Sequence, residues 1–281
     1  MEHVRWVDRP TLREPVVLAA FEGWNDAGDA ASTAARYLVD RWDLDAVADL
    51  DPEEFYDFTT TRPHVRLDEE GMREIDWPAT EIFAGTIPGG TTDVVVIIGH
   101  EPQLRWRTYT GELTQLASEL GARLCITLGA LLAEVPHTRP TPIVGTAYSP
   151  DVIAGIGLQP SRYEGPTGIV GVLHDAWRRG GLRSASLWAT VPSYVPGAPS
   201  PKAALALIER VSVMLETWVA TTDLEIAAAS YERQVSELVD ADEETSSYVT
   251  SLEERHDSDP EILPQSGASI ADEVERFLRD Q

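Results

Sequence analysis

The chain has 281 residues, 43% of them hydrophobic, and a formal net charge of −25. This length and composition are typical of a folded protein with a sizeable core, as one large domain or as one domain with an appendage. The excess of acidic residues disfavours contact with nucleic-acid phosphates and with anionic membrane surfaces. We therefore expect no nucleic-acid partner and no membrane partner.

Three further features predict a cytoplasmic protein. No apolar run approaches the roughly 18 residues of a membrane-spanning helix. The first residues, Met1–Trp6, lack the basic start and apolar stretch of a signal peptide. The single cysteine, Cys125, lies in an apolar run and has no partner for an intrachain disulfide, so we expect an inert core thiol.

Apolar runs between turn residues predict buried strands, and apolar residues at helical spacing predict helices. A first strand is expected at Pro15–Phe21, followed by a helix from Asp26 to Trp42 with a small-residue face, where Asp26 or Asp29 is the expected cap. An antiparallel meander follows, with strands at Phe55–Phe58, His64–Leu67, Arg73–Trp77 and Glu81–Ile87.

Strands and helices then alternate. The expected strands are Asp93–Ile98, Arg123–Ala130, Ile143–Ala147 and Ser184–Val191, and the expected helices are Thr110–Leu120, Gly165–Arg179 and Pro201–Ala220. From Thr222 onward the sequence is acidic and helix-forming, with an interruption at Pro260–Gly267 and a last amphipathic segment. The pattern predicts an α/β fold, a three-layer mixed sheet with an inserted β-meander, as a core domain (1–221) with an acidic helical C-terminal appendage (222–281).

Polar segments follow five of the predicted strands. In an open α/β sheet, segments that leave the carboxyl ends of strands gather at one edge, where ligands bind. We therefore expect one edge that binds a ligand or a partner. Its candidate residues are Glu22, Trp24, Asn25, Asp26, Asp29, His100, Glu101, Arg105, Trp106, His137, Thr138, Arg139, Tyr163, Gly165, Thr167 and Tyr194.

Each segment has a chemical and a structural interpretation. The acidic turn Glu22–Asp29 could hold a metal or act as acid and base, or it could cap a helix. His100 and Glu101 could supply a base or ligand and Arg105 could bind an anion, or they could form a salt-bridged loop under Trp106.

The two remaining segments are shaped by proline and glycine. The proline-stiffened loop Pro136–Pro140 is suited to recognition or to a subunit contact. Gly165–Gly168 could offer free amides to an anion or simply start a helix.

Common catalytic motifs are missing from the sequence. It contains no Gly-x-Ser-x-Gly, His-Glu-x-x-His, Cys-x-x-Cys or Gly-x-Gly-x-x-Gly motif, and its six histidines are dispersed. We therefore assign no catalytic residue, no cofactor and no metal.

Five short motifs occur in order along the chain: Gly23–Gly28, Gly99–Trp106, Pro136–Pro140, Gly165–Gly168 and Leu263–Arg279. Together they resemble the proteasome assembly chaperone family in its form from high-G+C bacteria, the family of the second eukaryotic chaperone subunit. The resemblance implies a phosphorylase-like α/β fold, self-association and, for some relatives, a role in assembling 20S proteasome rings. Proteasome-docking tails end in a hydrophobic residue, a tyrosine and one further residue, which the last residues Leu278–Gln281 do not match.

The leading hypothesis is a non-enzymatic assembly-chaperone-like or interaction protein linked to 20S proteasome assembly. Its expected partners are itself, as a homo-oligomer with a trimer as first guess, and proteasome subunits. The alternative is a binding protein or enzyme that holds a small molecule, nucleoside-like or anionic, at the strand-end edge. A third hypothesis is that this edge is the interface between subunits.

Overall fold

The computed structural model describes residues 1–68, 70–149, 152–153, 159–160 and 164–258. The strands in this part of the chain are β1 (Val4–Trp6), β2 (Val16–Glu22), β3 (Asp45–Leu50), β4 (His64–Leu67), β5 (Arg73–Asp76), β6 (Thr80–Thr86), β7 (Asp93–His100), β8 (Leu124–Ala133), β9 (Ile143–Ala147), β10 (Gln159–Pro160) and β11 (Ser184–Pro192). The helices are α1 (Ala30–Trp42), α2 (Trp106–Glu119), α4 (Ile169–Arg179), α5 (Pro201–Met214), α6 (Thr222–Asp240) and α7 (Glu243–Ser258), with short 3-10 turns η1 (Ala27–Asp29) and η2 (Pro52–Glu54).

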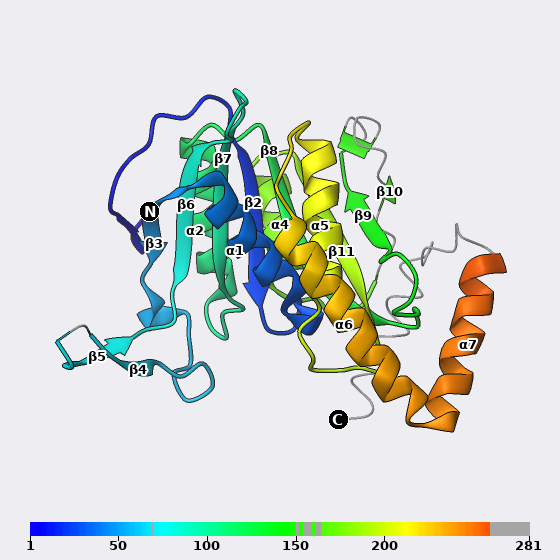
Figure 1. Cartoon of the computed structure of the whole chain (residues 1–281). Helices are drawn as coiled ribbons and strands as arrows, with labels where there is room; N and C mark the ends of the chain where they lie inside the picture. Colours follow the sequence, from blue (N-terminus) through cyan, green and yellow to red (C-terminus); the bar gives the residue numbers. More distant parts are fainter. Residues whose placement is uncertain (69, 150–151, 154–158, 161–163, 259–281) are drawn as a thin grey trace.

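One mixed sheet forms the centre of the molecule (Figure 1), with the described strands in the order β1-β3-β6-β7-β2-β8-β11-β9-β10. The central strands β7, β2, β8 and β11 are parallel, whereas β6 and β9 run antiparallel beside them. Parallel strands buried on both faces are apolar throughout, which explains the uninterrupted runs in β2 and β7.

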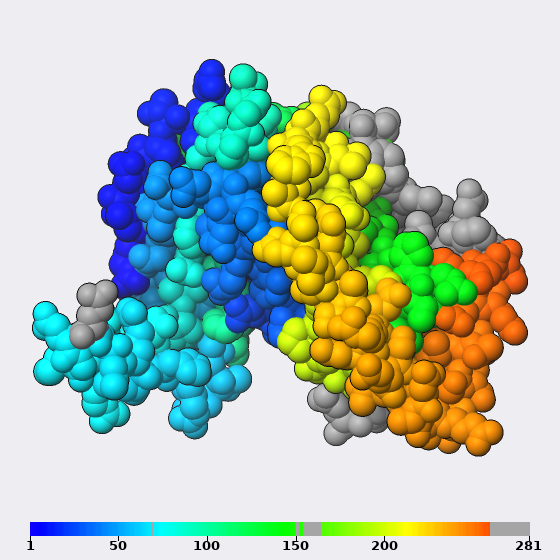
Figure 2. Space-filling view, viewed as in Figure 1, coloured from blue at the N-terminus to red at the C-terminus, as the bar shows by residue number. Residues whose placement is uncertain are grey.

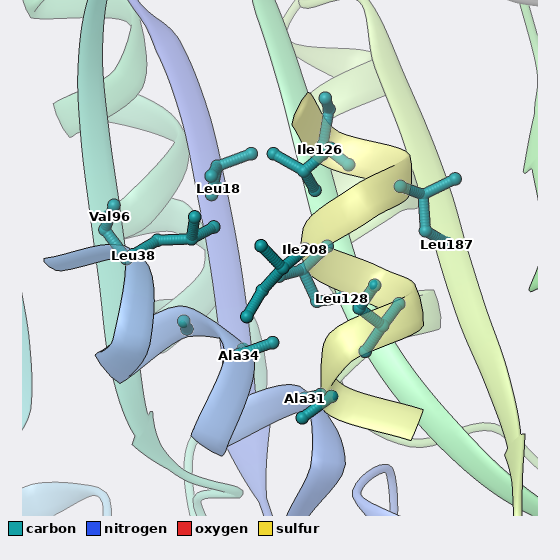
Figure 3. Close-up of a cluster of buried hydrophobic side chains, with 14 of the residues drawn as sticks. Leu18, Ala31, Ala34, Leu38, Val96, Ile126, Leu128, Leu187 and Ile208 are labelled. Atoms are coloured by element: carbon teal, nitrogen blue, oxygen red, sulfur yellow. The ribbon is translucent and has the colours of Figure 1, made fainter. Parts of the chain in front are cut away.

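Helices cover both faces of the sheet, so the predicted three-layer α/β fold is confirmed. Alternate residues of a strand face opposite sides. Leu18 and Val96 belong to the core under α1 and α5, whereas Val17 and Ile97 belong to the core under α2 and α4. Figure 3 shows the first of these cores, with side chains from α1 and α5 gathered over the sheet.

The small-residue face of α1 is confirmed and has a packing role. Ala30, Ala31, Ala34 and Ala35 are fully buried. Such short side chains let α1 lie close to both the sheet and its neighbour α5.

The predicted meander is only partly right. Phe55–Phe58 is not a strand, because Pro52 and a side-chain cap from Asp51 start the η2 turn immediately before it. Phe55 and Tyr56 instead enter the core. The hairpin β4–β5 is antiparallel as expected but forms a separate two-stranded sheet, while β6 joins the main sheet beside β3.

Several predicted helix boundaries are also corrected. Helix α2 begins at Trp106, earlier than the expected Thr110, directly after Arg105 in a left-handed conformation (φ 53°). Helix α4 begins at Ile169, because Gly168 before it is extended. Helix α5 ends at Met214 and not at Ala220, since Glu216 adopts a positive φ of 50°.

Two acidic helices follow the core. Helix α6 packs along α5, and α7 packs on α6 (Figure 1). Leu224 of α6 joins the main core, whereas Val235, Val239 and Val249 form a separate small cluster with Tyr231. The interruption at Pro260–Gly267 and the last amphipathic segment lie outside the described residues, and the domain boundary after residue 221 stays a prediction. None of the helices in the described part of the chain is long and apolar enough to cross a membrane.

Candidate functional site

The loop after β2 continues along the edge of β8 and leads into α1. Gly23 adopts a φ of 110°, which turns the chain. The amide of Ala130 in β8 then donates to the carbonyl of Asn25 at 2.9 Å, and Asp26 forms an isolated parallel bridge with Ala130. This pairing holds Asn25 and Asp26 at the carboxyl end of the sheet, and both side chains are buried.

Glu101 connects three of the predicted segments. Its Oε1 accepts hydrogen bonds from Asn25 Nδ2 at 2.9 Å and from the amide of Ile169, the first residue of α4, at 2.7 Å. A Cβ added at Gly168 would lie 2.7 Å from Asn25 Oδ1, Glu101 Oε1 and Trp24 Cε3, so the close approach requires glycine. The sequence motifs around Asn25, Glu101 and Gly168 are therefore one packed unit.

Asp26 is the acceptor for the first turn of α1. Its carboxylate accepts the amides of Ala31 at 2.6 Å and Ser32 at 3.2 Å. Asp29 precedes the helix in a left-handed conformation (φ 49°) and makes no side-chain capping bond. Of the two expected caps, Asp26 is thus the one that accepts hydrogen bonds from the free amides at the start of α1. Burial of its carboxyl raises the pKa of Asp26 to about 6.

A cavity of about 500 Å³ opens beside this unit. Its lining comes from the loop after β2, the end of β8, strand β9, the middle of β11, the loop after β11, and the first half of α4 with the residues before it. The large side chains in the lining are Trp24, Tyr148 and Trp188, and Asp26, Asp29 and Thr167 are among its polar members. A volume in this range is typical of small-molecule sites.

A buried polar network lies against the cavity. Thr127 Oγ1 donates to Ser186 Oγ at 2.9 Å and shares a hydrogen bond with His174 Nε2 at 2.8 Å. His174 Nδ1 lies 3.0 Å from Ser184 Oγ. Burial lowers the pKa of His174 to about 4, so this imidazole is neutral at neutral pH.

Sequence reasoning missed this network, as well as Tyr148 and Trp188. The sequence did contain a signal for this network, namely hydroxyl residues inside two apolar strands. Two of them, Thr127 and Ser186, lie directly opposite each other in the β8–β11 register. Recognising that pairing needs the strand order, which the sequence does not state.

Glu22 and His100 form a separate cluster outside the cavity lining. His100 Nδ1 lies 2.9 Å from Glu22 Oε2, and Arg36 Nη2 lies 2.8 Å from Glu22 Oε1. The bond from His100, followed by that from Arg36, lowers the pKa of Glu22 to about 2 against the effect of burial. This is a structural ion-pair network on the surface.

Arg105 and Trp106 also lie away from the cavity. Arg105 pairs with Glu54, and the indole N–H of Trp106 donates to the carbonyl of Pro102. Arg105 therefore has a carboxylate partner within the chain, which matches the salt-bridged loop and not an anion site.

The loop Pro136–Pro140 is covered by the chain's own C-terminal helices. His137 contacts Tyr194 through Nδ1 at 2.8 Å and Ser236 of α6 through Nε2 at 2.9 Å. Arg139 holds Asp257 of α7 in a two-bond fork, with both bonds at 2.8 Å. Thr138 adds a bond to Glu253. The structure places this loop in an intramolecular contact, and it lines only a small pocket of about 10 Å³.

The predicted edge therefore divides into parts. Trp24, Asn25, Asp26, Asp29 and Thr167 line the cavity, and Glu101 lies behind it. Gly165 is exposed near the start of α4, and Tyr163 lies outside the described residues. Among the described residues, no group of three or more His, Cys, Asp or Glu side chains is arranged to hold a metal ion.

These features define a three-layer α/β protein whose strand-end loops surround a cavity and whose C-terminal helices dock on one of those loops. The PAC2 family model matches residues 20–239. The chain belongs to the PAC2 family, which confirms the resemblance to the proteasome assembly chaperone family.

Solved structures show the same relationship. A PAC2 family protein from Streptomyces avermitilis is 44% identical, with 84% of this chain and 99% of that chain covered and a TM-score of 0.79. A proteasome-assembly chaperone homologue from Mycobacterium tuberculosis is also 44% identical, with 83% and 99% covered and a TM-score of 0.76. An archaeal proteasome activator from Pyrococcus furiosus, at 18% identity, 85% and 99% coverage and a TM-score of 0.64, shares the fold. No curated protein matches the chain.

Proposed function

We propose that this chain is a non-enzymatic, assembly-chaperone-like interaction protein linked to assembly of the 20S proteasome. Membership of the PAC2 family supports the proposal, as does 44% identity to a protein named as a proteasome-assembly chaperone homologue. Self-association in the cytoplasm is part of the proposal, with a trimer as the first state to test.

The structural observation that carries an interaction role is the hairpin β4–β5. Val65 lies opposite Ile75 in the register and Leu67 lies opposite Arg73, and alternation places Trp77 on the same face as these residues. The apolar side chains of this face, Val65, Leu67, Ile75 and Trp77, are between 46% and 67% exposed. The hairpin projects from the body of the molecule, at the lower left of Figure 2.

The opposite face of the hairpin is polar. His64 lies opposite Asp76, and Arg66 Nη2 lies 3.0 Å from Glu74 Oε2 across the strands. A two-stranded sheet with one apolar face is marginal in water unless that face packs against something. An exposed face that is apolar apart from Arg73 is typical of a protein-binding surface. We assign it to contact with a proteasome α subunit.

The experiment mixes the full chain with purified α subunits of the 20S proteasome and follows ring formation by native mass spectrometry. The wild type is expected to bind α subunits and to change the yield or rate of ring formation. The double variant Val65→Thr/Ile75→Thr keeps β-branched side chains but makes the directly opposed pair of this face polar, and we expect a loss of about tenfold or more in binding.

Val213→Thr is the matched control, because Val213 is an exposed valine on α5, away from the hairpin. It should bind like the wild type. The same spectra report the mass of the free protein and so its subunit number. Absence of any complex with α subunits would remove the proposed function. Undiminished binding by the hairpin variant would remove only the assignment of this surface.

A further inference from the structure

The cavity at the strand ends is not used by the proposed function. We propose that it is a binding site for a small organic cation, an amine carried on an apolar or aromatic body. This inference does not depend on proteasome assembly, since it rests on the chemistry of the cavity lining alone.

Among the described residues that line the cavity, the carboxylates Asp26 and Asp29 are the charged side chains. Asp26 and Asp29 belong to its lining, and no lysine or arginine does so among the described residues. The two arginines expected at this edge, Arg105 and Arg139, pair with Glu54 and Asp257 elsewhere. His174, also in the lining, is buried within its own hydrogen-bond network. In this described part of the lining, an anion would meet carboxylates without a compensating charge, whereas a cation would gain from them.

The aromatic side chains of the lining favour a ligand with a flat apolar or aromatic body. Trp24 is 40% exposed and Tyr148 is 55% exposed, so their rings are accessible at the cavity. Trp188 is fixed by the sheet, because it pairs with Gly129 and a Cβ there would lie 2.6 Å from its ring. Aromatic faces attract cations and pack against flat apolar groups.

The side chain of Asn25 adds an acceptor to the site. Asn25 is 1% exposed and belongs to the lining. Its Nδ2 donates to Glu101, and within the described residues its Oδ1 accepts no hydrogen bond. A carbonyl oxygen in a cavity wall without a donor favours a ligand that carries N–H groups. An ammonium group supplies both the donor and the charge that Asp26 and Asp29 favour.

The test compares three probes that share an indole ring and a two-carbon linker: tryptamine, indole-3-propanamide and indole-3-propionate. Isothermal titration calorimetry on the full chain at pH 7.5 measures each affinity. We expect tryptamine to bind at least about tenfold more tightly than the neutral amide, and the carboxylate to bind most weakly. Equal affinities, a preference for the carboxylate, or no saturable binding of tryptamine at millimolar concentration would each overturn the proposal.

Variants then locate the binding. Asp29→Asn should weaken tryptamine several-fold and leave the amide unchanged, because Asp29 makes no capping bond that the fold needs. Asp45→Asn is the control, since it removes the same charge at an exposed position on β3. Thr146→Trp should fill the cavity and abolish binding of all probes. If that variant does not fold, Tyr148→Ala, at an exposed side chain, should weaken tryptamine instead. Tryptamine binding that none of these lining variants weakens would place the probe elsewhere and overturn the proposal.

Discussion

Asn25 Nδ2 donates a hydrogen bond to Glu101 Oε1 at 2.9 Å and joins the loop after β2 to the loop after β7. The same oxygen accepts the amide of Ile169 at 2.7 Å and so holds the start of α4. One carboxylate oxygen therefore fixes three segments that are distant in the sequence.

Removing that oxygen should destabilise the fold. We expect Glu101→Ala to lower the free energy of unfolding by about 1–3 kcal/mol, because it leaves the buried Asn25 amide without its partner. Glu101→Gln keeps an acceptor oxygen and should cost less. Urea denaturation measures both variants. Equal losses for the two would mean that the side chain acts by packing and not through these hydrogen bonds.

Adding a methyl group at Gly168 should also lower the stability of the fold. The added Cβ would lie 2.7 Å from three side-chain atoms, so Gly168→Ala is expected to lose about 1–3 kcal/mol of stability through overpacking. Gly111→Ala is the control, because Gly111 lies inside α2 with open space around it. That variant should gain about 0.5–1 kcal/mol from helix propensity. A neutral Gly168→Ala would contradict the tight packing of this unit.

Asp26 should give stability a distinctive pH dependence. Burial raises its pKa in the folded state from 3.8 to about 6, so the folded state holds its proton more tightly than the unfolded state does. Its contribution to stability therefore falls as pH rises from about 4 to about 6. The free energy of unfolding of Asp26→Asn, measured relative to that of the wild type, should therefore rise by about 1–2 kcal/mol between pH 5.0 and 7.5.

Urea denaturation of both proteins across that pH range gives the difference, and carbon-13 NMR titrates the Asp26 carboxyl directly. Glu22 titrates identically in the two proteins, so its contribution cancels from the difference in the free energy of unfolding. A pH-independent difference, or a carboxyl that titrates near 4, would exclude the raised pKa.

Lys202 offers a direct probe of how α6 docks. It is the only lysine of the chain. Its Nζ donates to the carbonyl of His137 and pairs with Glu232 of α6, and its side chain is 17% exposed. An amine acylating reagent should therefore modify Lys202 at least about tenfold more slowly than it would an unprotected lysine.

Glu232→Ala should speed this modification, measured as the mass increase of the peptide that carries Lys202, with the N-terminal amine as internal reference. Glu237→Ala removes an exposed acid of the same helix and should change nothing. Rapid labelling of the wild type would contradict the docked position of α6.

The central strands were predictable from the sequence because a strand buried on both faces has an uninterrupted apolar run. The runs at Val16–Phe21 and Val94–Ile98 contain no polar residue, and they are the central parallel strands. The alanine spacing in α1 likewise identified its buried face. The convergence of Asn25, Glu101 and Gly168 followed from the rule that strand ends share an edge.

The missed features depend on contacts that sequence patterns do not encode. The aromatic run Phe55–Phe58 has strand propensity, but the cap and proline of η2 determine its conformation. The partners of His137 and Arg139 lie on helices about a hundred residues later in the chain, so their intramolecular role was not visible. The position of Trp188 at the cavity depends on the strand order, which places it between Gly129 of β8 and Val144 of β9.

The placement of β2 between two later strands has a consequence for biosynthesis. A ribosome releases β2 first, yet its neighbours β7 and β8 emerge only after the meander has been translated. Until then the nascent polypeptide carries an unpaired strand with the apolar run Val16–Phe21, the kind of segment that aggregates when left uncovered. Any fragment that stops before Ser184 also lacks the strand that carries Trp188, so occupancy of the cavity would report that translation had passed that point.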